Sequence, residues 1–161
     1  ENTKILLSVG EVIKRKNHEV IIRSLSKLKD KNFVYIICGR GPLLEQLKEL
    51  AVQLGLEKKV KLLGFRKDIA EICKIADLFV FPSIHEGLPV ALMEAIASNI
   101  PAIASDIRGN RDLLSSDSLC KSNKEDEWRL LLEYKKIKKQ SLDKKYYVEN
   151  IMEKIRAIYG L

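Results

Sequence analysis

Short apolar runs alternate with more polar stretches from the start of the chain. Each run is three to five residues long and mostly apolar throughout, which is typical of strands that are covered on both faces of a parallel sheet. The pattern predicts strands at residues 5–9, 33–37, 60–63, 78–81 and 102–104.

The stretches between these runs carry apolar side chains every three or four residues, the period of a helix that buries one face. Such stripes run through Ile21–Leu28, Leu43–Leu54 and Ile69–Ala76. Gly55 follows the second stripe, where glycine commonly ends a helix. Strands and helices alternating at this spacing form βαβ units with right-handed crossovers. We therefore predict an α/β fold, a Rossmann-like doubly wound parallel sheet with helices on both faces.

The sequence changes character after about residue 121. Residues 122–145 are polar, with Trp128 and three neighbouring large residues as their main apolar content. The last segment carries apolar residues at spacings of three and four from Val148 to Ile158, which predicts an amphipathic helix. We expect residues 1–161 to form one domain, with C-terminal helices over about 122–159 that pack on the sheet.

Composition is that of an ordinary soluble domain. Of the 161 residues, 46% are hydrophobic and 32% are charged. No apolar run approaches the roughly 20 residues that span a bilayer, and the first residues do not resemble a signal peptide. The cysteines Cys38, Cys73 and Cys120 are odd in number and far apart, so buried free thiols are the better interpretation. We expect a cytoplasmic protein.

The net charge of +7 raises the question of an anionic partner. Its densest part is the lysine cluster between Lys135 and Lys145, which a solvated helix face explains best. Attraction to the inner face of an anionic membrane is the alternative. No zinc-finger spacing or helix-turn-helix pattern supports a nucleic-acid partner. Neither His18 nor His85 has a partner at metal-ligand spacing, so we expect no metal and no cofactor. His18 follows Asn17, a plausible helix N-cap, which favours a surface or capping role.

Candidate site residues follow each predicted strand. Ligands of open α/β sheets bind beyond the carboxyl ends of the strands. Gly10, Gly39, Gly64, Glu86 and Ser105 all fall at such ends, so the sequence predicts one shared site.

The segment from Ser83 to Glu94 is the most informative part of that site. It reads as a strand end, a loop that Gly87 allows to turn sharply, and a helix with Pro89 in its first position. Free N–H groups at a helix start can hold a phosphate, and carboxylates such as Glu86 accept hydrogen bonds from sugar hydroxyls. A nucleotide-sugar offers both groups.

This segment resembles the Glu-x7-Glu signature of retaining glycosyltransferases with the GT-B fold, most closely glycosyltransferase family four (glycosyl transferases group 1). The resemblance extends in unbroken order over about residues 4–115 and includes four further segments: Ser8–Glu11 with Arg15–His18, Gly39–Pro42, Leu63–Phe65 and Pro101–Asn110. It implies the C-terminal, donor-binding half of such an enzyme, with the N-terminal acceptor domain absent from this chain.

The resemblance also implies roles for individual residues. Glu86 is the expected catalytic residue, next to the donor sugar, and Glu94 accepts hydrogen bonds from the ribose. Lys16, with Arg15, is expected to neutralise the diphosphate, although Glu11 stands where the family most often has Arg. The remaining donor-binding residues line the diphosphate, the helix start or the base, where backbone contacts and Arg66 would meet uracil: Gly10, Gly39, Gly41, Phe65, Arg66, Gly87, Leu88, Pro89 and Val90.

The resulting hypothesis is a hexosyltransferase-type donor domain. It would bind a nucleotide-diphosphate sugar, most plausibly a UDP-sugar, for metal-independent transfer to an acceptor hydroxyl with retention, in surface polysaccharide or glycolipid synthesis. The acceptor would be a sugar or a lipid-linked glycan held by the missing domain, so the isolated chain should bind nucleotide and transfer little. The alternatives are a nucleotide-sugar epimerase half-domain and a non-catalytic nucleotide-binding module.

Overall fold

The computed structural model describes residues 3–28, 32–133 and 139–141. The predicted amphipathic helix between Val148 and Ile158 lies outside these residues, as does most of the lysine cluster. None of the described helices is both long and apolar enough to cross a membrane.

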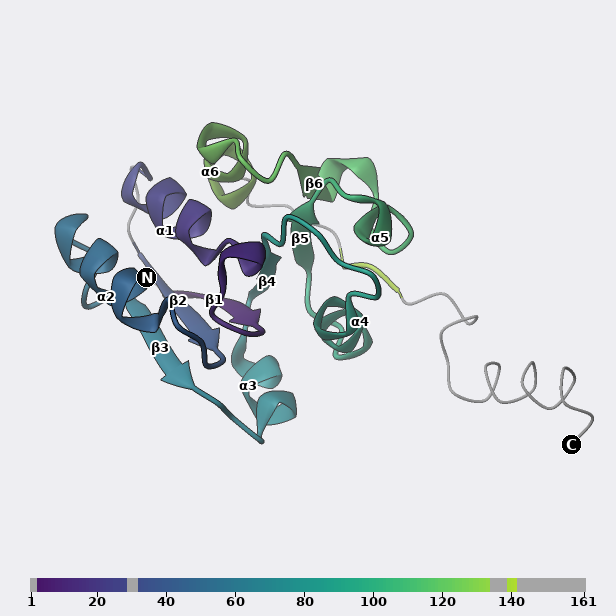
Figure 1. Ribbon diagram of the computed structural model, residues 1–161. Coiled ribbons are helices and arrows are strands. Elements are labelled where there is room, and N and C mark those ends of the chain that lie inside the picture. The colour runs from purple at the N-terminus through teal and green to yellow at the C-terminus, as the bar shows by residue number, and fades with distance from the viewer. Residues whose placement is uncertain (1–2, 29–31, 134–138, 142–161) are drawn as a thin grey trace, which may run out of the picture.

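Six parallel strands form one sheet at the centre of the molecule (Figure 1). Their spatial order is β3-β2-β1-β4-β5-β6, so β1 pairs with β2 on one side and with β4 on the other. Five strands fall within one residue of their predicted ends, and a two-residue sixth strand was not predicted. The strands are β1 (Lys4–Val9), β2 (Phe33–Cys38), β3 (Val60–Gly64), β4 (Leu78–Phe81), β5 (Ala102–Ser105) and β6 (Leu119–Cys120).

Helices cover both faces of the sheet, which confirms the predicted fold class (Figure 1). α1 (His18–Ser26), α2 (Leu44–Gln53) and α6 (Glu125–Glu133) pack on one face, and α3 (Ile69–Ile75) and α4 (Val90–Ala97) on the other. The short elements are η1 (Lys14–Lys16), α5 (Arg108–Arg111) and η2 (Ser116–Ser118). Neighbouring strand residues point to opposite sides of the sheet. Leu6 therefore lies in the core under α1, α2 and α6, and Leu7 lies in the core under α3 and α4.

The helix α6 packs mainly along α1 and against β6, the last strand of the sheet. Its Trp128 is fully buried in the core that α1 shares with the sheet. The Ser24 hydroxyl donates to the Glu125 carbonyl at 2.9 Å, and Lys27 pairs with the Glu125 carboxylate at 2.8 Å. These contacts fix the start of α6 beside α1.

Backbone hydrogen bonds join the loops at the carboxyl ends of the three strands β3, β2 and β1. The Gly39 N–H donates to the Gly64 carbonyl at 2.7 Å, and the Gly10 N–H donates to the Cys38 carbonyl at 3.0 Å. A Cβ added to Gly39 would overlap the Gly10 carbonyl oxygen. Glycine is required here because two loop backbones touch.

The three cysteines are buried free thiols, as the sequence predicted.

Candidate functional site

A buried carboxylate and two cations meet where β1 and β4 end. Lys16 Nζ lies 2.7 Å from Glu86 Oε1, and Arg15 NH1 lies 3.0 Å from the same oxygen. The side chains of Glu86 and Lys16 are only 8% and 13% exposed, whereas Arg15 is 41% exposed. The fold thus brings together three predicted site residues from two segments that lie 70 positions apart. We call these three residues the ion cluster.

Local backbone geometry directs Lys16 into this position. Lys16 ends the short helix η1, and Asn17 after it adopts a left-handed conformation with φ of 53°. Gly10 has a φ of +152°, and a Cβ there would lie 3.3 Å from Lys16 Cε. The Lys16 ammonium also lies over the Phe81 ring, 5.1 Å from its centroid, which favours a cation at this point. Gly10 therefore leaves room for the Lys16 side chain to cross toward Glu86.

Arg15 connects the loop after β1 to the loop after β4. Its carbonyl accepts a hydrogen bond from the Ile84 N–H at 2.9 Å, and its guanidinium donates to the His85 carbonyl at 2.9 Å. These two bonds hold the residues just before Glu86. The loop that carries the cations and the loop that carries the carboxylate are therefore joined by two hydrogen bonds.

The electrostatics of the ion cluster keep Glu86 ionised. Burial by itself would raise the pKa of the Glu86 carboxyl, but hydrogen bonding and charge from Lys16, with the charge of Arg15, outweigh it and hold the pKa below its ordinary value. Two cations and one carboxylate leave the cluster with a net positive charge. Such a site attracts an anion while it keeps one strong hydrogen-bond acceptor.

The second glutamate of the signature lies apart from the ion cluster. Glu94 is exposed on α4, and its side chain makes no hydrogen bond or ion pair with any residue that the structure describes. Burial raises the pKa of the Cys73 thiol on α3, and the charge of Glu94 acts in the same direction. Its carboxylate is therefore available to a ligand.

The loop between Glu86 and α4 differs in detail from the expectation. Pro89 is the N-cap of α4, with φ of −82°, and helical geometry begins at Val90 rather than at Pro89. Gly87 is not one of the glycines with positive φ, so no left-handed turn occurs there. Leu88 and Val90 expose 60% and 52% of their surface. These apolar side chains are therefore exposed in the segment that joins Glu86 to α4.

The predicted base-binding loop presents an aromatic ring and an arginine that the sequence analysis did not single out. Phe65 is 58% exposed after β3, and the Arg40 guanidinium lies over its ring at 5.6 Å from the centroid. Arg66 instead pairs with Asp68, with Nε 2.8 Å from Oδ1. Arg40 stands between Gly39 and Gly41, so its position beside two strand-end glycines was the signal that could have identified it.

His18 is buried, and the surface or capping role expected for it is therefore wrong. The side chain is 4% exposed, and its ring faces Tyr35 in the core. Asn17 makes no capping hydrogen bond either, because its side-chain amide donates to the Ser122 carbonyl at 2.8 Å. The left-handed backbone of Asn17 directs this side chain toward the start of α6.

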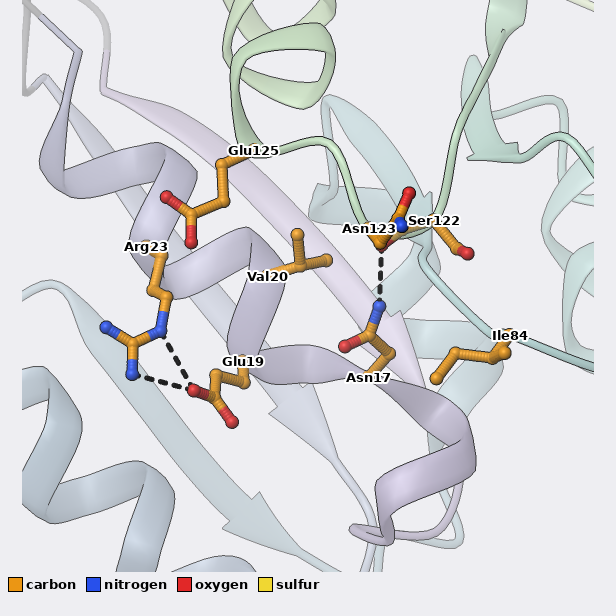
Figure 2. Close-up of a pocket in the computed structure, with 8 residues that line it drawn as sticks. All are labelled: Asn17, Glu19, Val20, Arg23, Ile84, Ser122, Asn123 and Glu125. Carbon is orange, nitrogen blue, oxygen red and sulfur yellow. Dashed lines mark hydrogen bonds and ion pairs between the residues drawn. The ribbon is translucent and has the colours of Figure 1, made fainter.

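A groove of about 420 Å³ lies between the first turns of α1 and α6 (Figure 2). Figure 2 shows the Asn17 side chain reaching across it to Ser122, with Ile84 on one side and the Arg23–Glu19 ion pair on the other. The residues of the ion cluster do not line this groove, which borders the same loops from the other side. Within the described residues, no three or more His, Cys, Asp or Glu side chains gather as a metal-binding group.

Comparison with solved structures shows which fold this chain shares. The lipopolysaccharide outer core galactosyltransferase WaaB aligns with 99% of this chain and 50% of its own, with a TM-score of 0.85 and 20% identity. HepE from Anabaena, in complex with UDP-glucose, aligns with 82% of this chain and 38% of its own, with a TM-score of 0.76 and 23% identity. The fold is that of one half of a GT-B glycosyltransferase.

Sequence comparison gives the family. The model of the family "Glycosyl transferases group 1" matches residues 1–150, and the chain belongs to this family. A UDP-Gal:alpha-D-GlcNAc-diphosphoundecaprenol alpha-1,3-galactosyltransferase of Escherichia coli is 34% identical over 121 residues, which are 72% of this chain and 31% of that protein. The chain spans about a third of the length of the curated relatives it matches.

Proposed function

We propose that this chain is the donor-binding half of a retaining glycosyltransferase of family four. It binds a UDP-sugar and presents the sugar for transfer to an acceptor hydroxyl with retention at the anomeric carbon. The observation that carries the proposal is the ion cluster, where Lys16 and Arg15 meet the nearly buried carboxylate of Glu86. The E. coli relative is named for a UDP-Gal donor, and HepE was crystallised with UDP-glucose, which supports a uridine diphosphate donor.

Lys16 and Arg15 are the groups that neutralise the diphosphate. When the bond between the anomeric carbon and the diphosphate breaks, negative charge grows on the leaving oxygen, and fixed cations stabilise that charge most effectively. Lys16 has three N–H donors and uses one toward Glu86, so it can contact phosphate without leaving the carboxylate. We assign the backbone at Gly10 and from Gly87 to Val90, at the start of α4, to the same diphosphate.

Glu86 acts on the donor sugar. An ionised carboxylate that is held by two cations accepts hydrogen bonds from sugar hydroxyls and orients the sugar over the diphosphate. Glu94 accepts from the ribose hydroxyls, because it is exposed and unpaired among the described residues. We assign Phe65, with Gly39 and Gly41, to the side of the site that holds the base.

The acceptor and the cellular setting extend the same proposal. The relative from Campylobacter jejuni, 36% identical over 115 residues, is named for a diphospho-undecaprenol substrate, as is the E. coli relative. We therefore propose a sugar or lipid-linked glycan acceptor in surface polysaccharide synthesis, held by a second domain in the cleft between the two halves. The reaction proceeds without a metal, at the cytoplasmic face of the membrane.

The test is calorimetric titration of the chain with UDP, GDP and ADP, with and without a chelator. We expect selective micromolar to millimolar binding of UDP that the chelator leaves unchanged. Glu94→Ala should weaken UDP binding by about tenfold, which is the effect of losing hydrogen bonds between a carboxylate and the ribose. Failure of the wild-type chain to bind any nucleotide would contradict the proposal, and binding of GDP or ADP in preference would change the donor.

A further inference from the structure

Buried polar groups of β1, β2, β4 and α1 form a hydrogen-bonded series inside the core. The Tyr35 hydroxyl lies 2.8 Å from Ser8 Oγ and 3.4 Å from His18 Nδ1, and the Ser8 hydroxyl donates to the Val80 carbonyl. Tyr35 is fully buried, Ser8 is 1% exposed and His18 is 4% exposed. Polar groups are costly to bury unless they are hydrogen-bonded, so such a chain holds its members in one arrangement.

The Val80 carbonyl at the end of this series decides which group donates each hydrogen bond. A carbonyl oxygen can only accept, so Ser8 gives its proton to Val80 and Tyr35 gives its own to Ser8. With the Tyr35 proton donated to Ser8, we assign His18 the tautomer that carries its proton on Nδ1 and donates to the Tyr35 oxygen. Burial raises the pKa of Tyr35, which keeps this hydroxyl protonated. Burial, with the charge of Lys16, lowers the pKa of His18 to about 4. The Glu11 backbone acts in the opposite direction, because a hydrogen bond to it favours the charged ring.

These groups connect the two elements that deliver the ion cluster. Ser8 belongs to β1, which leads to Lys16, and Val80 belongs to β4, which leads to Glu86. His18 begins α1 two residues after Lys16, with the left-handed Asn17 between them. The Asn17 amide is tied to Ser122 on its other side. The two residues that follow Lys16 are therefore both held in place, Asn17 by its bond to Ser122 and His18 by its contact with Tyr35.

We propose that His18, through Tyr35 and Ser8, is a positioning residue that sets where Lys16 lies relative to Glu86. The inference rests on the proposed function for its catalytic consequence, since Lys16 is there assigned to the diphosphate. Loss of the Nδ1 donor lets the start of α1 shift, and Lys16 then leaves the position in which it contacts Glu86 and the diphosphate together.

The test combines two measurements on a set of variants of the chain. His18→Phe and Tyr35→Phe remove the hydrogen bond while they keep a ring in the core, and His18→Asn keeps a donor close to the position of Nδ1. Ser24→Ala is the matched control, because Ser24 is equally buried in α1 but bonds to Val20 and Glu125, away from Lys16. The first measurement is the UDP dissociation constant, and the second is the pKa of the Glu86 carboxyl by NMR.

We expect His18→Phe and Tyr35→Phe to weaken UDP binding by about tenfold, the equivalent of one net hydrogen bond. Both should raise the Glu86 pKa toward its ordinary value, whereas His18→Asn and Ser24→Ala should leave both quantities near wild type. In a Lys16→Ala background, His18→Phe should have no further effect on UDP binding, because its action passes through Lys16.

An unchanged Glu86 pKa in both ring variants would overturn the inference, as would a full further loss of UDP binding in the Lys16→Ala background. The NMR measurement needs no nucleotide, so it separates the two proposals. If the wild-type chain binds no nucleotide but the Glu86 pKa still responds to His18→Phe, the proposed function fails and the positioning role stands.

Discussion

Gly39 packs so closely on Gly10 that a side chain on Gly39 would overlap the Gly10 carbonyl oxygen. The contact joins the loop after β2 to the loop that carries Arg15 and Lys16. Gly41 makes a similar contact with the Val12 backbone. The two glycines of this Gly-x-Gly segment therefore let its backbone pack directly on the backbone of the loop that leads to the ion cluster.

Gly39→Ala should destabilise the chain by about 3 kcal/mol, because the added methyl meets a backbone that cannot move aside easily. Gly87→Ala is the control, since a Cβ there meets nothing within 4 Å and φ is not positive. Urea unfolding of the two variants measures the difference. Equal stability of Gly39→Ala and wild type would show that the loops are not in close contact.

The buried ring of His18 predicts a pH dependence of folding. Its pKa in the folded chain is about 4, below the ordinary value of 6.5, so the unfolded chain takes up a proton between these values and the folded chain does not. Stability should therefore be highest above pH 6.5 and fall by about 2 kcal/mol between pH 8 and 5. Urea unfolding across this range tests it. His18→Phe should remove this part of the slope, whereas His85→Gln, at an exposed position, should keep it.

Phe65 should contribute to nucleotide binding through its exposed ring. Stacking of a base on an aromatic side chain is worth about 1–3 kcal/mol, so Phe65→Ala should weaken UDP binding by at least about fivefold. The variant should bind inorganic pyrophosphate as wild type does, since pyrophosphate lacks the base. Arg66→Ala should have a smaller effect, because Arg66 already pairs with Asp68. Equal losses for UDP and pyrophosphate in Phe65→Ala would mean that the loop, rather than the base contact, is disturbed.

The sheet was predictable because its five main strands are apolar runs that need burial on both faces. The strand β6 was missed because Leu119–Cys120 is too short to form a pattern and exists through its pairing with β5. The helix α6 falls in the region where C-terminal helices were expected, but the burial of Trp128 beside α1 could not be predicted from the sequence. Local patterns thus identify elements that bury much apolar surface, and tertiary contacts decide the rest.

The candidate site was predictable as a location but not as a set of contacts. Lys16 and Glu86 are each visible in the sequence, yet their ion pair depends on how β1 and β4 pair across the sheet. His18 was expected at the surface because a polar residue near a helix start is usually solvated. It is buried beside Tyr35 of β2, a hydrogen-bond partner that spacing along the sequence does not reveal.

The most direct test of the central claim is UDP binding to Lys16→Ala. Lys16 lies beside Glu86 with its side chain 13% exposed, whereas Lys48 pairs with Glu45 on the exposed surface of α2 and serves as the matched control. We expect Lys16→Ala to weaken UDP binding by at least about tenfold, because a charge-assisted hydrogen bond to phosphate is lost. Lys48→Ala should bind UDP as wild type does. Titration calorimetry at one fixed salt concentration measures both. If Lys16→Ala binds UDP as tightly as wild type, the ion cluster is not the diphosphate site.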